Sequence, residues 1–191
     1  MERRKLGTQG LETAAIGLGC VSMSDFYGDA DSGEAIATIH RALDIGVDFL
    51  DTSDCYGPFV NEELVGRAIA GRRDEVVVAT KWGFLRNERG DWLGMDATRR
   101  RAPEACDASL RRLGVDHIDL WYIHWPDPGI PIEETIAGMA DQVQAGKVRY
   151  IGISNVTEEQ VRAAHAVHPI SAVQNDYSLA VRTDEAHVLP A

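Results

Sequence analysis

Residues 47–57 combine a short apolar segment with acidic, hydroxyl and phenol side chains. Phe49 and Leu50 indicate the end of a buried strand, and polar residues follow from Asp51 to Tyr56. In a parallel α/β sheet, ligands bind beyond the carboxyl ends of the strands, so an acid and a phenol here could act on one reacting atom. The same acidic residues could instead cap the N-terminus of a helix. The rest of the chain decides between these interpretations.

Four more apolar segments end on polar side chains in the same way. A lone lysine at such an end could simply extend into solvent. In a parallel barrel, however, all strand ends face one mouth, and five polar ends in succession argue against chance. We therefore predict that these residues surround one site: Asp51, Lys81, His124, Ser154 with Asn155, and Gln174.

The side chains at these ends form a coherent set for acid–base chemistry on a carbonyl. The phenol of Tyr56 has an ordinary pKa of about 10, which makes it a poor proton donor near neutrality. The ammonium of Lys81 favours the phenolate and is expected to lower that pKa, with Asp51 holding Lys81 in place. Tyr56 could then protonate a carbonyl oxygen while His124 orients the carbonyl.

A second group of residues suits a flat amide and an aromatic ring. Ser154, Asn155 and Gln174 offer donors and acceptors for a carboxamide, and Tyr177 could stack on a ring. The glycines of 14–20 suggest that a ligand approaches the backbone near Gly19 and Cys20, although packing explains Gly17 equally well.

Strand-like and helix-like segments alternate along the chain. Strands are predicted to begin near residues 14, 48, 76, 118, 148 and 172, and helices over 33–45, 61–70, 103–113, 133–145 and 157–168. Glu62 and Glu63 lie in the first turn of the second helix, where the helix dipole favours acids. A hairpin-like segment is predicted before the first strand. Residues 84–102 are predicted to form a long loop, and residues 188–191 are predicted to begin a helix. The alternation predicts a parallel sheet with helical crossovers.

Composition and charge narrow the class of protein. The 191 residues are 45% hydrophobic and 26% charged, as expected of one globular domain. A formal charge of −11 argues against a nucleic-acid partner. Neither a signal peptide nor an apolar stretch of membrane-spanning length is apparent, so no membrane partner is expected. The three cysteines, Cys20, Cys55 and Cys106, lack metal-ligand spacing, so we predict no metal site. We expect them to be free thiols in a reducing cytoplasm. Cys55 is expected to be a residue of the pocket wall.

As a set, the motifs of the chain resemble those of the aldo-keto reductase superfamily. The resemblance covers nearly the whole chain and is carried by residues 51–57, 61–66, 80–83, 109–114, 118–120, 123–126, 146–155 and 174–178. It implies an α/β fold of the parallel (β/α)₈ TIM-barrel type, a bound NADP(H), and interconversion of a small-molecule carbonyl and an alcohol.

The resemblance also implies roles for individual residues. Tyr56 is expected to be the proton donor, with Asp51, Lys81 and His124 completing a catalytic tetrad. Cofactor contacts are expected at Gly19, Cys20, Asp51, Ser154, Asn155, Gln174 and Tyr177. Apart from the resemblance, the aromatic residues Trp82, Trp125, Tyr27 and Phe26 could line a substrate pocket beside Tyr56 and His124, although any barrel mouth has an apolar wall.

The chain departs from the family at its end, because only six strands are predicted where the barrel has eight. We expect residues 1–191 to be a single barrel domain that is truncated at its C-terminus, with exposed edges on the first and sixth strands. A second copy of the chain could cover these edges, or the short form could have a new role.

Two other classes of function are weighed beside the enzyme. A catalytically inactive binding or regulatory subunit would suit an incomplete cofactor site. A glycosidase would need a second carboxylate at a strand end to pair with Asp51, and the sequence offers none.

Overall fold

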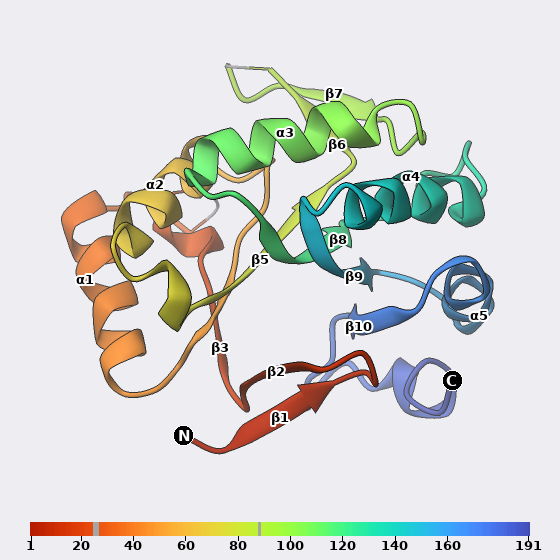
Figure 1. Ribbon diagram of the computed structural model, residues 1–191, viewed down its shortest axis with the longest axis horizontal. Coiled ribbons are helices and arrows are strands. Elements are labelled where there is room, and N and C mark those ends of the chain that lie inside the picture. The colour runs from red at the N-terminus through yellow and green to blue at the C-terminus, as the bar shows by residue number, and fades with distance from the viewer. Residues whose placement is uncertain (25–26, 88) are drawn as a thin grey trace.

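Six parallel strands form the central sheet of the computed structural model, which describes residues 1–24, 27–87 and 89–191 (Figure 1). In chain order they are β3 (Gly17–Gly19), β4 (Phe49–Asp51), β5 (Val77–Trp82), β8 (Ile118–Ile123), β9 (Val148–Ser154) and β10 (Ile170–Gln174). Each strand lies beside its predecessor, in the order β10-β9-β8-β5-β4-β3. The sheet curls like part of a barrel and stays open, with β3 and β10 at its edges (Figure 1). The expected six-stranded, incomplete barrel is confirmed.

Helices connect successive strands and cover the outer face of the sheet (Figure 1). They are α1 (Ser32–Asp44), α2 (Val60–Ile69), α3 (Ala102–Leu113), α4 (Ile132–Gln144) and α5 (Glu158–Val167). Their ends follow local chemistry. Asp31 accepts a hydrogen bond from the Glu34 amide before α1, and Thr157 and Gln160 form a capping box on α5. Gly114 ends α3 in the left-handed conformation that glycine adopts without strain.

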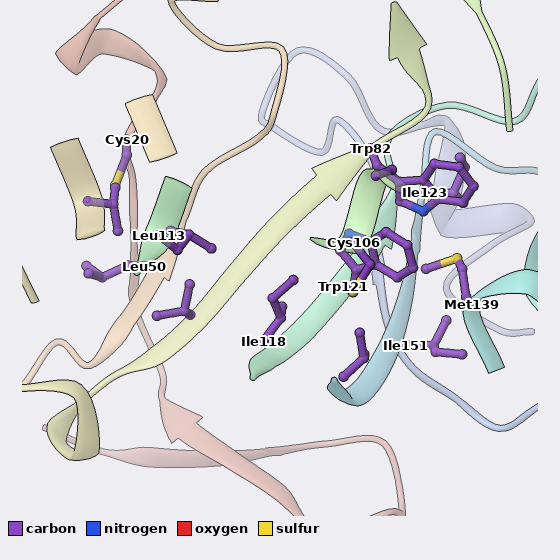
Figure 2. Packing of buried hydrophobic residues seen from close by; sticks show 14 of the residues in the cluster. Cys20, Leu50, Trp82, Cys106, Leu113, Ile118, Trp121, Ile123, Met139 and Ile151 are labelled. Carbon is purple, nitrogen blue, oxygen red and sulfur yellow. The ribbon is translucent and has the colours of Figure 1, made fainter. Parts of the chain in front are cut away.

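The hydrophobic core lies between the helices and the outer face of the sheet (Figure 2). Every residue of β8 is buried, as expected of a parallel strand covered on both faces. Trp82 of β5 and Trp121 of β8 stack in this core with ring centroids 5.0 Å apart. A smaller cluster on the inner face joins Leu120 and Tyr122 of β8 to Leu11.

Two antiparallel hairpins flank the sheet. The first, β1 (Arg3–Leu6) with β2 (Leu11–Ala14), confirms the hairpin-like segment expected before the sheet. The strand expected from residue 14 is shorter than predicted, because β2 ends at Ala14 and β3 begins only at Gly17. The second hairpin, β6 (Phe84–Arg86) with β7 (Trp92–Met95), lies within residues 84–102, so the prediction of a plain loop was wrong.

Short 3-10 helices complete the described structure: η1 (Val21–Met23), η2 (Arg73–Glu75) and η3 (Thr183–Ala186). Residues 187–190 form a turn after η3, so the helix expected over 188–191 is not formed. Within the described ranges, no helix combines the length and the apolar character needed to span a bilayer.

Candidate active site

The polar residues that follow the strands lie along one edge of the sheet, in sheet order. Asp51 ends β4, Lys81 is the penultimate residue of β5, and His124 directly follows β8. Ser154 ends β9 and Gln174 ends β10, and these two residues are register partners. Because the strands are parallel, all five residues meet at the carboxyl edge, as the sequence predicts.

Lys81 is the buried centre of this edge. Its side chain extends from a strand that is buried almost throughout, and the residue is only 1% exposed. The ammonium donates to Asp51 Oδ2 at 2.6 Å, to the Thr52 carbonyl at 3.0 Å and to the Tyr56 hydroxyl at 3.3 Å. Burial by itself lowers the pKa of Lys81, but Asp51 and Tyr56 outweigh it and hold the pKa above its ordinary value. Lys81 is therefore a charged group fixed between an acid and a phenol.

The phenol of Tyr56 behaves differently from the expectation that Lys81 lowers its pKa. Burial raises the pKa of Tyr56, and Lys81 offsets only part of that rise, so the net direction is upward. The phenol consequently keeps its proton at neutral pH, in the form that a proton donor needs. Its ring meets that of His124 edge to face, with centroids 5.7 Å apart.

His124 is oriented by two side chains that sequence reasoning did not assign to it. Its Nδ1 lies 3.1 Å from Ser53 Oγ and 3.6 Å from Cys55 Sγ. Burial, and secondarily Lys81, lower the pKa of His124 to about 3, so the imidazole is neutral. With Nδ1 engaged, Nε2 is the ring nitrogen left to act on a ligand. Cys55 is buried and its pKa is raised to about 12, chiefly by burial, which agrees with a wall residue rather than a nucleophile.

A buried polar network beneath this group ties the strand ends to α2. Thr52 donates to Asn61 Oδ1, and Thr80 donates to Glu62 Oε1, each at 2.6 Å. Glu62 is fully buried and pairs with Arg112 of α3 at 2.6 Å. Its position in the first turn of α2 was predicted correctly, but the explanation by the helix dipole was incomplete. Glu62 links β5, α2 and α3.

The residues expected to hold a carboxamide also gather at one place. Ser154 donates to the Gln174 carbonyl at 2.6 Å, and Asn155 Nδ2 donates to the His124 carbonyl at 2.9 Å. Asn155 adopts a left-handed conformation with φ of 56°, which turns the chain sharply after β9. Tyr177 is half exposed, and its hydroxyl donates to Glu185 at 2.7 Å.

Two features near Asp51 fit a polar ligand. Asp51 Oδ1 is buried and has no hydrogen-bond partner among the described residues, which is costly unless a ligand donor reaches it. Gly19 is the register partner of Asp51, and a Cβ built on it meets nothing within 4 Å. A ligand can therefore approach the backbone here. Cys20 is buried, and its amide donates to the Asp51 carbonyl.

The aromatic residues expected around a substrate divide into two groups. Trp82 is 0% exposed in the core, because neighbouring residues of a strand point to opposite faces and Lys81 takes the inner one. We therefore leave Trp82 out of the proposed pocket. Trp125 is 48% exposed and Tyr27 is 77% exposed, while Phe26 lies outside the described residues. Sequence reasoning missed Phe84, whose ring centroid is 5.1 Å from that of His124.

Comparisons with known proteins agree with this architecture. The profile of the Aldo/keto reductase family matches residues 15–191. An aldo-keto reductase from Bacillus halodurans, solved in a holo form, is 34% identical over 97% of this chain, with a TM-score of 0.88. A glycerol dehydrogenase from Gluconobacter oxydans is 34% identical over 98%, with a TM-score of 0.86. An aldo-keto reductase from Klebsiella pneumoniae in complex with NADPH is 31% identical over 100%, with a TM-score of 0.82. This chain spans 61%, 58% and 64% of their respective lengths.

Proposed function

Because the chain belongs to the aldo/keto reductase family, we propose that it is an oxidoreductase that interconverts aldehydes or ketones and alcohols with NADP(H). The observation that carries this proposal is the position of Lys81. Its ammonium is in hydrogen-bonding contact with both Asp51 and Tyr56, and the Tyr56 ring in turn contacts His124. This is the arrangement needed to donate a proton to a carbonyl oxygen.

In this proposal Tyr56 is the general acid. Its hydroxyl gives its proton to the carbonyl oxygen, and the phenolate that remains is stabilised by the Lys81 ammonium, 3.3 Å away. The neutral imidazole of His124 donates a hydrogen bond from Nε2 to the same oxygen, because Ser53 at Nδ1 can serve as the donor to that nitrogen. Asp51 keeps Lys81 charged and aimed at the phenol. Solvent returns the proton to Tyr56 after turnover.

The cofactor-binding residues follow from the same edge of the sheet. Ser154, Asn155 and Gln174 would hold the carboxamide of the nicotinamide, and Tyr177 would stack on its ring. The buried Asp51 Oδ1 and the open space at Gly19 fit a ligand with hydroxyl donors. When bound, NADPH supplies the hydride that reduces the carbonyl carbon.

The expectations about the cell and about partners also belong to this proposal. Three buried free thiols suit a reducing cytoplasm. The exposed edges at β3 and β10 suit pairing with a second copy of the chain. No nucleic acid or membrane partner is proposed.

Replacing Tyr56 with phenylalanine tests the proposed role directly. We expect the turnover number for NADPH-dependent reduction of an aldehyde to fall by about 10²- to 10⁴-fold, the usual contribution of a positioned general acid. The dissociation constant of NADPH should be unchanged. Tyr150→Phe is the matched control, because Tyr150 lies near the opposite end of β9 from Ser154.

Two outcomes would overturn the proposal. Equal turnover in wild type and Tyr56→Phe would remove Tyr56 as the acid. Wild-type chain that binds NADPH and never turns over any aldehyde would favour the inactive binding or regulatory subunit instead.

A further inference from the structure

The β6–β7 hairpin places a row of aromatic rings beside the proposed proton-donating group. The ring of Phe84 meets that of His124 at 5.1 Å between centroids, with an interplanar angle of 72°. The ring of Trp92, on the opposite strand of the hairpin, meets Phe84 at 5.2 Å and 76°. Together with the contact between Tyr56 and His124, these contacts form a continuous aromatic surface that leads away from the phenol.

The outer end of this surface is open to a ligand. Phe84 is partly buried, whereas Trp92 is 51% exposed. Half of the indole surface is therefore open, and a flat apolar group can pack against exposed aromatic surface of this kind.

Arg86 fixes the hairpin in this position. Its Nη1 donates to the Cys55 carbonyl at 2.6 Å, directly beside Tyr56 along the chain. Its Nε and Nη2 donate to the Gly90 carbonyl at 3.2 and 3.0 Å, across the turn of the hairpin. The guanidinium also lies over the Trp92 ring, 4.6 Å from its centroid. Arg86 therefore fixes the position of both the hairpin and the indole ring. Its guanidinium donates the hydrogen bonds named above to backbone carbonyl oxygens.

Further contacts anchor the hairpin at its root and at its turn. A Cβ on Gly83 would lie 2.7 Å from Ile123 Cδ1, so the root is pressed against the end of β8. A Cβ on Gly90 would lie 3.9 Å from Pro58 Cδ, close to the residues that follow Tyr56. The aromatic surface is thus held against the end of β8 on one side and against residues 56–58 on the other.

We infer that the β6–β7 hairpin is a specificity element, in which Phe84 and Trp92 form one wall of the substrate site and Arg86 positions them. This inference rests on the proposed function and names its substrate class. The wall selects carbonyl compounds, and the corresponding alcohols, that carry an aromatic ring next to the reacting carbon. Short aliphatic compounds have no flat aromatic face to pack against these rings, so they gain less from this wall.

The test measures binding rather than turnover. Dissociation constants of benzyl alcohol and 1-butanol are measured by NMR titration of the 191-residue chain, in wild type and in Trp92→Ala. Leu93→Ala is the matched control, because Leu93 is the next residue of β7, points to the other face and is 62% exposed. Trp92 is also half exposed, so its replacement is compatible with folding.

We expect wild type to prefer benzyl alcohol, and Trp92→Ala to reduce that preference about 2- to 12-fold, the range for one aromatic pair. Leu93→Ala should leave the preference unchanged. Arg86→Met should reduce it as Trp92→Ala does, because the indole loses its support. Any of three results would overturn the inference. Trp92→Ala could lose affinity equally for both alcohols, wild type could show no preference, or benzyl alcohol could show no saturable binding. Failure of the proposed function would be seen separately, as turnover unaffected by Tyr56→Phe.

Discussion

Replacing Arg112 with methionine probes the ion pair that fixes α2 beneath the proposed catalytic residues. Glu62 is fully buried; its Oε2 accepts from Arg112 Nε, and its Oε1 accepts from Thr80, the neighbour of Lys81. Without Arg112, the carboxylate keeps one neutral hydrogen bond and loses its counter-charge. Breaking a buried ion pair from one side costs about 3–5 kcal/mol. The free energy of unfolding of a domain is about 5–15 kcal/mol in total, so a loss of this size should be easy to measure.

Urea unfolding followed by circular dichroism measures this loss. With a slope of about 3 kcal/mol per molar urea, the midpoint should fall by about 1 M or more. Arg162→Met is the control, because Arg162 forms an exposed pair with Glu158 on α5 and should cost about 0.5 kcal/mol or less. The double variant Glu62→Met with Arg112→Met should recover much of the loss, since no buried charge remains.

A loss below about 1 kcal/mol at pH 7 would refute the argument, as would a double variant less stable than the single one.

Two further predictions concern charged groups near the site. Lys81→Met removes the ammonium that contacts Asp51 and Tyr56, so we expect turnover to fall about 10²-fold or more. The pKa of the Tyr56 phenol, measured by ultraviolet titration, should rise further. An unchanged phenol pKa would contradict the contact between Lys81 and Tyr56. Burial, and secondarily Glu62, raise the pKa of Asp54 to about 8. The protonated carboxyl of Asp54 therefore stabilises the folded state fully below pH 3.8, the ordinary pKa of the group. This stabilisation is lost as the pH rises through about 8. Urea unfolding at pH 5 and pH 8 should show wild type losing more stability than Asp54→Asn across this range, and parallel losses would contradict the pKa.

The alternation of strands and helices was sufficient to predict a parallel sheet with helical crossovers, and the family resemblance added the barrel. Short β-branched segments, capped helices and glycine stops are local signals, so the elements lie within a few residues of their predicted positions. The order of the strands follows from right-handed crossovers between neighbours. The β6–β7 hairpin escaped prediction because its strands are three and four residues long and carry no clear alternation of polar and apolar residues.

The site was predictable where a residue type at a strand end decides the chemistry, as for Lys81. It was less predictable where the three-dimensional contact decides. Ser53 reaches His124 across 71 positions of sequence, and nothing local marks that contact. Trp82 was predicted to line the pocket, but strand alternation places it in the core behind Lys81. The direction of the Tyr56 pKa depends on how burial compares with the Lys81 charge, which sequence alone does not give.

The most direct test of the central claim follows a label from cofactor to product. NADPH carrying deuterium at both C4 positions is incubated with benzaldehyde and the wild-type chain, and the benzyl alcohol is analysed by mass spectrometry. The proposed function predicts alcohol with one deuterium on carbon, formed by wild type and by Tyr150→Phe but strongly reduced in Tyr56→Phe. Alcohol without deuterium, or labelled alcohol formed equally fast by Tyr56→Phe, would contradict it.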